Sequence, residues 1–142
     1  MWKTRCSGFV VYAAALPAVA CTVSADPMAF MPINPLDAAS TDSFSRIDVY
    51  CPDPTEYSIS LSAGNGDFAD RTLTGTSGNL AYNIYADASR STIWGDGSGS
   101  TVTVSGTADA AGVSHTAYGR IPAQPTAIPG MYADTLVVTV TY

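Results

Sequence analysis

An antiparallel β-sandwich is the fold class that the sequence predicts, and three observations carry this prediction. Apolar and polar residues alternate over several short stretches, which is the period of a strand with one buried face. Segments rich in Gly, Asn and Asp separate these stretches and are typical of turns. No stretch has the pattern of a helix, apart from a single turn expected at residues 37–41. The length of 142 residues suits one domain.

The first 20 residues have the three-part pattern of a secretory signal. Lys3 and Arg5 precede the apolar stretch 8–16, and the segment "PAVA" ends in small residues. We therefore expect a signal peptide over residues 1–20, cleaved after Ala20, and a mature domain over residues 21–142. The apolar stretch is far shorter than the roughly 20 residues of a membrane-spanning helix. A lipoprotein signal before Cys21 is a weaker alternative, because Leu16 stands too far from that cysteine.

The mature chain is strongly acidic. Removal of Lys3 and Arg5 leaves four arginines and no lysine against twelve acidic residues, a net charge of −8. This charge disfavours binding to nucleic acid or to anionic lipid and favours solubility outside the cell.

Two cysteines remain after cleavage, Cys21 and Cys51, because Cys6 belongs to the signal. In an exported protein such a pair is expected to form a disulfide.

The predicted strands follow one another along the mature chain, each with an inward-facing apolar set. They are residues 45–51 with Ile47, Val49 and Cys51, residues 57–62 with Tyr57, Ile59 and Leu61, residues 79–85 with Leu80, Tyr82 and Ile84, and residues 100–106 with Val102 and Val104. The predicted turns are 63–68, 74–79, 95–100 and 108–113.

The segment "YADTLVVTVTY", residues 132–142, is the most strand-like in the sequence and lies at its end. Leu136, Val138, Val140 and Tyr142 share one face, and that face is strongly apolar. A strand of this kind is expected inside a sheet with a neighbour on each side. The missing neighbour must then come from elsewhere, and strand donation by another protein is a known way to supply it.

Candidate catalytic residues are few, and we expect no enzyme, no cofactor and no metal site. His115 is the single histidine, no G-x-S-x-G motif exists, and the free thiols of a nucleophilic site are lacking. Asp67 and Asp70 form a pair of carboxylates in a turn, where such residues usually bond the backbone. The segment 95–100, "GDGSGS", lacks the acidic ligands of a calcium loop.

Four aromatic residues could line a sugar-binding surface, but a place in the core is the commoner role of such residues in a small sandwich. They are Trp94, Tyr118, Tyr132 and Tyr142.

Several motifs together identify a family. They are "CTVSADPMAF", "NPLDA", "YSISLSAGNGDFADRTL", "LAYNIYADASRSTIWGDG", "HTAYGRIPA" and "GMYADTLVVTVTY". With these motifs, residues 21–142 closely resemble the spore coat protein U domain, which is shared with subunits of archaic chaperone-usher pili in Gram-negative bacteria.

The resemblance implies an immunoglobulin-like sandwich that lacks its final strand. A periplasmic chaperone would lend that strand first, and an outer-membrane usher would exchange it for a segment of the next pilin subunit. By position, Leu136, Val138, Val140 and Tyr142 would border the strand groove and contact the chaperone, and Cys21 and Cys51 would form the family's disulfide. The protein would then be a structural subunit of a surface fimbrium, secreted through the periplasm and serving adhesion or biofilm formation.

One departure from the family pattern bears on the place of the subunit in a fibre. Cleavage after Ala20 leaves no donor segment before Cys21, so the subunit would accept a strand without giving one, as a terminal subunit does. Alternatively, the true start lies further upstream and residues 9–16 are a donor strand. A self-sufficient secreted or coat-type β-sandwich of the cell or spore surface is the alternative function.

Overall fold

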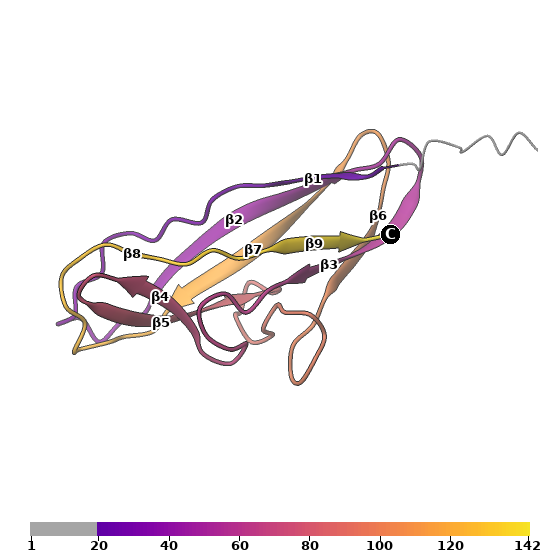
Figure 1. Ribbon diagram of the computed structural model, residues 1–142. Helices are drawn as coiled ribbons and strands as arrows, with labels where there is room; N and C mark the ends of the chain where they lie inside the picture. Colours follow the sequence, from indigo (N-terminus) through magenta and orange to yellow (C-terminus); the bar gives the residue numbers. More distant parts are fainter. Residues whose placement is uncertain (1–19) are drawn as a thin grey trace, which may run out of the picture.

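The computed structural model describes residues 20–142, so the predicted signal peptide lies outside the described residues except for Ala20. Two antiparallel sheets form the fold (Figure 1). The described strands are β1 (Thr22–Ala25), β2 (Thr41–Tyr50), β3 (Thr55–Leu61), β4 (Arg71–Gly75), β5 (Gly78–Tyr85), β6 (Val104–Ala108), β7 (Val113–Ile121), β8 (Tyr132–Ala133) and β9 (Val138–Thr141).

The larger sheet has the order β1-β2-β7-β5-β4-β8, and the smaller has the order β6-β3-β9. Every ladder between these strands is antiparallel. The predicted immunoglobulin-like β-sandwich is therefore confirmed. In residues 20–142 no helix is long and apolar enough to cross a membrane.

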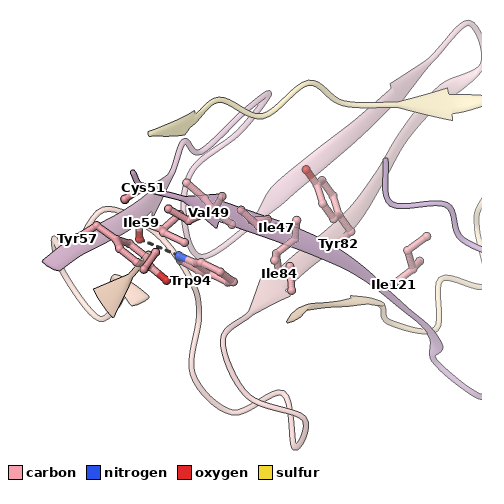
Figure 2. Packing of buried hydrophobic residues seen from close by; sticks show 12 residues of the cluster. Ile47, Val49, Cys51, Tyr57, Ile59, Tyr82, Ile84, Trp94 and Ile121 are labelled. Atoms are coloured by element: carbon pink, nitrogen blue, oxygen red, sulfur yellow. Dashed lines mark hydrogen bonds between the residues drawn. The ribbon is translucent and has the colours of Figure 1, made fainter. Parts of the chain in front are cut away.

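The alternating residues of the predicted strands form the core. Its buried members are Ile47, Val49, Cys51, Tyr57, Ile59, Leu61, Tyr82, Ile84, Trp94, Ala108, Ala117 and Ile121. Figure 2 shows how they line the space between the sheets. Trp94 is fully buried, and its indole N–H donates a hydrogen bond to the carbonyl oxygen of Ile59 at 3.0 Å. This bond satisfies the polar atom of the largest buried side chain.

The predicted disulfide between Cys21 and Cys51 is confirmed. The β1–β2 ladder pairs Thr22 with Tyr50, so the cysteines are the next residues on each strand and face one another with a Cα–Cα distance of 4.2 Å. The disulfide links the start of β1 to the end of β2.

We expect the double variant Cys21→Ala, Cys51→Ala to unfold more easily than the native chain. Loss of a crosslink that spans 30 residues costs about 3 to 4 kcal/mol in the chain-entropy model. A urea titration measures the shift, and reduction of the native chain should reproduce it. The double variant should still bind the same strand partner as the native chain. An unchanged urea midpoint, or a change in that partner, would contradict the prediction.

Two local predictions were wrong in detail. The expected turn at residues 37–41 lies earlier, because the amide of Asp37 donates to the carbonyl of Asn34, whose side chain also accepts from the amide of Leu36. Thr41 already belongs to β2. The strand predicted over residues 100–106 begins only at Val104, because Val102 instead forms an isolated bridge with Trp94.

His115 lies on β7 and has a structural partner across the sandwich. A hydrogen bond of 2.6 Å joins the hydroxyl of Tyr57 and Nε2 of His115, and the two rings meet edge to face. Burial lowers the pKa of His115 and raises the pKa of Tyr57, so both groups are favoured in their neutral forms. The single histidine therefore serves this contact in the described structure.

His115 should make the protein less stable as the pH falls from 7 to 5. The unfolded imidazole takes up a proton near pH 6.5, whereas the folded one resists it until a lower pH. Stability is thus complete above pH 6.5 and declines below it, with a slope under about 1.4 kcal/mol per pH unit. Urea midpoints at pH 7, 6 and 5 should show this slope for the native chain and lose it for His115→Gln. An equal slope in both proteins would assign it to other groups.

Candidate functional site

An open groove with a volume of about 660 Å³ lies between the two edges of the sandwich. One wall is the segment 25–33, which follows β1, and the other is the segment 130–138, which includes β8 and the start of β9. Both sheets supply the floor, through Ile47, Leu61, Leu73, Leu80, Tyr82, Ile84, Ala117 and Ile121. The groove is therefore lined mainly by apolar side chains.

The first wall is extended but carries almost no ladder. Its backbone bonds to β2 are few: the amide of Asp26 donates to the carbonyl of Arg46 at 2.9 Å, and the carbonyl of Ala29 accepts from the hydroxyl of Ser43 at 2.5 Å. Met28, Phe30 and Ile33 pack half-buried against the core. Most of this wall is thus held by apolar contacts, and its backbone has spare hydrogen-bonding capacity.

Gly119 on β7 lets the first wall approach closely. A Cβ atom there would lie 2.3 Å from the sulfur of Met28 and 2.8 Å from the ring of Phe30. Any larger residue would push the wall outward and change the width of the groove.

The second wall departs from the single strand predicted over residues 132–142. It consists of β8 and β9 with a bend between them. Where the ladder with β3 would continue, the carbonyl of Ser62 is taken by the guanidinium of Arg71. The amide of Val137 instead donates to the hydroxyl of Ser62 at 2.9 Å. The amide of Ser62 still donates to the carbonyl of Val137 at 3.0 Å, so the diversion of the Ser62 carbonyl removes one of the two ladder bonds here, and the regular strand begins at Val138.

β9 is an edge strand, as expected of a strand whose second neighbour must come from elsewhere. It pairs with β3 through Leu61↔Val138 and Ile59↔Val140, and within residues 20–142 no strand pairs with its other side. Figure 1 shows β9 running alongside β3 to the end of the chain. An unpaired edge beside an apolar groove is a place where a further strand can add.

The four predicted groove residues fall into different environments. Leu136 and Val138 line the groove, and both are half-buried. Val140 packs partly buried against the core beyond the groove. Tyr142 is 57% exposed at the end of β9. The structure thus brings two of the four together at the groove, and the contact of all four with a chaperone stays a prediction.

A polar cluster interrupts the apolar lining at the bend. Asp134 accepts hydrogen bonds from the hydroxyl of Tyr82 at 2.6 Å and from the amide of Asn65 at 3.0 Å. Burial, and then the bond to this carboxylate, raises the pKa of Tyr82 well above its usual value. Gly64 has a φ of +64°, and a Cβ there would lie 2.2 Å from the carboxylate. The cluster fixes the bend to the loop that follows β3.

Arg71 anchors the same region from inside the fold. Its side chain is fully buried, and its guanidinium donates to the carbonyls of Ser62 and Trp94 and to the side-chain oxygen of Asn83 at 2.7 Å. The guanidinium also lies 5.5 Å from the ring centre of Phe68. Burial lowers the pKa of Arg71, and the Asp134 carboxylate opposes that shift through its charge.

The other candidates from the sequence are accounted for by local bonds. Asp67 accepts from the amides of Ala69 and Asp70 at 2.8 Å, as expected of an Asp in a turn. Asp96 accepts from the amide of Ser98 in the segment 95–100. Across residues 20–142 no group of three metal-ligating side chains occurs.

The four aromatic residues considered for sugar binding do not form one surface. Trp94 is buried in the core, Tyr132 lines the groove, and Tyr142 follows the end of β9. Tyr118 lies on the outer face of the larger sheet, where the guanidinium of Arg90 is 5.7 Å from its ring centre. Trp94 thus has the core position that is the commoner role, and the four residues do not form the sugar-binding alternative.

The site residues missed from the sequence are Gly64, Arg71, Gly119 and Asp134. The signal for Arg71 was an isolated cation between two predicted turns, and the glycines carried no distinguishing pattern. All four act through contacts with distant segments, which periodicity does not report.

The fold and groove define an immunoglobulin-like sandwich with room for one more strand. The sequence matches the Spore Coat Protein U domain over residues 8–139, and the chain belongs to that family. The match begins inside the predicted signal peptide.

Among solved structures, the chain is similar to one from Acinetobacter baumannii, the CsuC–CsuE chaperone–tip adhesion subunit pre-assembly complex of archaic chaperone-usher Csu pili. The TM-score is 0.59 and the identity 22%, and the likeness covers 87% of this chain and 39% of the other. At this identity the likeness concerns the fold. No curated protein matches the chain.

Proposed function

We propose that the protein is a subunit of an archaic chaperone-usher pilus and that its groove accepts a strand from another protein. The observation that carries the proposal is the apolar groove beside the unpaired edge of β9. An inserted strand would bury half-exposed groups such as Phe30, Leu136 and Val138 and would pair with backbone groups of both walls. Family membership and the likeness to a pilus complex support this role.

The partners would be a periplasmic chaperone before assembly, an outer-membrane usher during export, and neighbouring pilins in the fibre. The protein would reach the cell surface through the periplasm and take part in surface attachment. Leu136, Val138, Val140 and Tyr142 would contact the donated strand or the chaperone, with Leu136 and Val138 in the groove itself.

The test is export of the chain to a periplasm with and without a candidate archaic chaperone. The proposal expects a soluble 1:1 complex on gel filtration with the chaperone and low yield or a low urea midpoint without it. An equally abundant and stable monomer in both cases would show that the fold closes itself. The self-sufficient secreted or coat-type sandwich would then be the better account.

The place in the fibre depends on the mature N-terminus. Cleavage after Ala20 would give a subunit that accepts a strand without donating one, which suits a terminal position. The family match from residue 8 favours a second candidate, in which residues 9–16 remain and act as a donor strand. N-terminal sequencing of the exported protein separates the two, since a start at Cys21 supports the terminal role and a start before residue 9 the donating one.

A further inference from the structure

The groove contains two of the three methionines that remain in the chain after signal cleavage. They are Met28 and Met31, and both line the groove from the segment 25–33, which is its first wall. The third, Met131, is 93% exposed, and its side chain does not line the groove. Two thioethers on one wall therefore border the space that a donated strand would fill.

Met31 is 74% exposed although it lines the groove. Met28 packs against the core, whereas Met31 is not among the residues packed there. Packing within the fold therefore does not account for this apolar side chain. An inserted strand would cover it and remove its apolar surface from water. Until a strand is bound, the thioether of Met31 is open to solvent and to dissolved oxidants.

Met28 is half-buried, and its sulfur occupies the space that Gly119 leaves free. A Cβ at Gly119 would lie only 2.3 Å from that sulfur, so the side facing β7 has no room for a further atom. At Gly119 β7 is paired with β2 on one side and with β5 on the other, so its backbone groups are taken by the ladders. An oxygen atom added to the sulfur would find neither space nor a hydrogen-bond donor there. Oxidation of Met28 would thus push the first wall away from β7.

The methionines are also the sulfur groups of residues 20–142 that remain open to oxidation. Cys21 and Cys51 are already joined in a disulfide. An exported chain leaves the compartment in which thiols are kept reduced. The first oxidation of this chain by a peroxide is therefore expected at methionine.

We propose that Met28 and Met31 form an oxidation-sensitive site, at which hydrogen peroxide converts the thioethers to sulfoxides and stops strand capture. The inference rests on the proposed function of the groove. In each reaction the O–O bond of the peroxide breaks and one oxygen bonds to the sulfur. The sulfur is oxidised by two electrons, and the peroxide is reduced to water. Because a sulfoxide is polar, covering it with an apolar strand costs free energy that covering a thioether does not. Sulfoxide reductases reverse this oxidation.

The first test treats the chain with hydrogen peroxide while it is unfolded in urea, so that every methionine reacts. Catalase then removes the peroxide, the chain is diluted into buffer with the candidate archaic chaperone, and gel filtration measures the 1:1 complex. We expect the yield of complex to fall about tenfold for the native chain, because polar groups would be buried without partners. The double variant Met28→Leu, Met31→Leu, in which Met131 is still oxidised, should keep the yield of the untreated chain.

Mass spectrometry reports which methionines carry oxygen. A normal yield of complex from a native chain with sulfoxides at both Met28 and Met31 would overturn the proposal, as would an equal loss in the leucine variant. Failure of the untreated native chain to form any complex would refute strand capture itself, and this inference with it. The two failures are therefore distinguishable.

Glutamine variants separate a loss of capture from a failure to fold. Glutamine has nearly the length of methionine and is polar, as the sulfoxide is. Met31→Gln should leave the urea midpoint unchanged, because the side chain is 74% exposed, and should lower capture about tenfold. Met131→Gln makes the same change outside the groove and is the matched control, which should leave both quantities unchanged. Native capture by Met31→Gln, or an equal loss with Met131→Gln, would show that the groove thioethers do not control capture.

Discussion

Val138→Asp should abolish capture of a donated strand. Val138 is on β9, pairs with Leu61 of β3 and lines the groove beside Leu136. An aspartate there would place an unpaired charge among apolar groups when a strand covers the groove, and burial of such a charge costs several kcal/mol. Co-purification with a tagged chaperone should therefore fall to background.

The neighbouring residue supplies a matched control. Val137 is 60% exposed and lies next to Val138 with its side chain on the other face of the chain. Val137→Asp makes the same chemical change and should leave capture close to the native level. Normal recovery of the complex with Val138→Asp would place the strand site elsewhere, and equal loss with both variants would point to damage to β9 itself.

The sandwich could be predicted because its strands carry local signals. Ile47 and Val49, and likewise Ile59 and Leu61, are two residues apart, and each pair is buried as the alternation predicted. When one face of a strand is buried and the other is exposed to solvent, apolar and polar residues alternate, so the sequence shows which residues point inward. The disulfide was also predictable, since residues 21–142 hold two cysteines.

The walls of the groove were harder to predict because distant contacts shape them. Alternation predicted one unbroken strand at the end of the chain. The bend before Val138 instead depends on Arg71, the first residue of β4, and on Ser62, which follows β3. The segment 25–33 has no two-residue alternation, yet it forms a wall because Gly119 leaves space beneath it. The contact of Arg71 with Ser62 and the contact of Gly119 with the segment 25–33 both involve distant residues, so the alternation within each wall does not predict them.

Arg71→Met should produce the largest loss of stability among single substitutions in this region. The guanidinium is fully buried and donates to the carbonyls of Ser62 and Trp94 and to the side chain of Asn83. Methionine fills similar space but leaves these acceptors without their charged donor, and loss of one partner from a buried charged network costs about 3 to 5 kcal/mol. Urea titration measures the effect, with Arg46→Met as the control, because Arg46 is largely exposed.

The same substitution should also disturb the groove, which distinguishes Arg71 from a residue that only stabilises the core. Arg71 holds the carbonyl of Ser62, and the hydroxyl of Ser62 holds the amide of Val137 at the start of β9. Without the guanidinium, this carbonyl is free to pair with Val137, and the regular strand can extend into the bend. We therefore expect weaker strand capture by Arg71→Lys, which keeps the charge but not the fork of donors, even under conditions where that variant remains folded. Native capture by a folded Arg71→Lys variant would mean that the position of β9 does not depend on the fork, and that the bend is fixed by Asp134 alone.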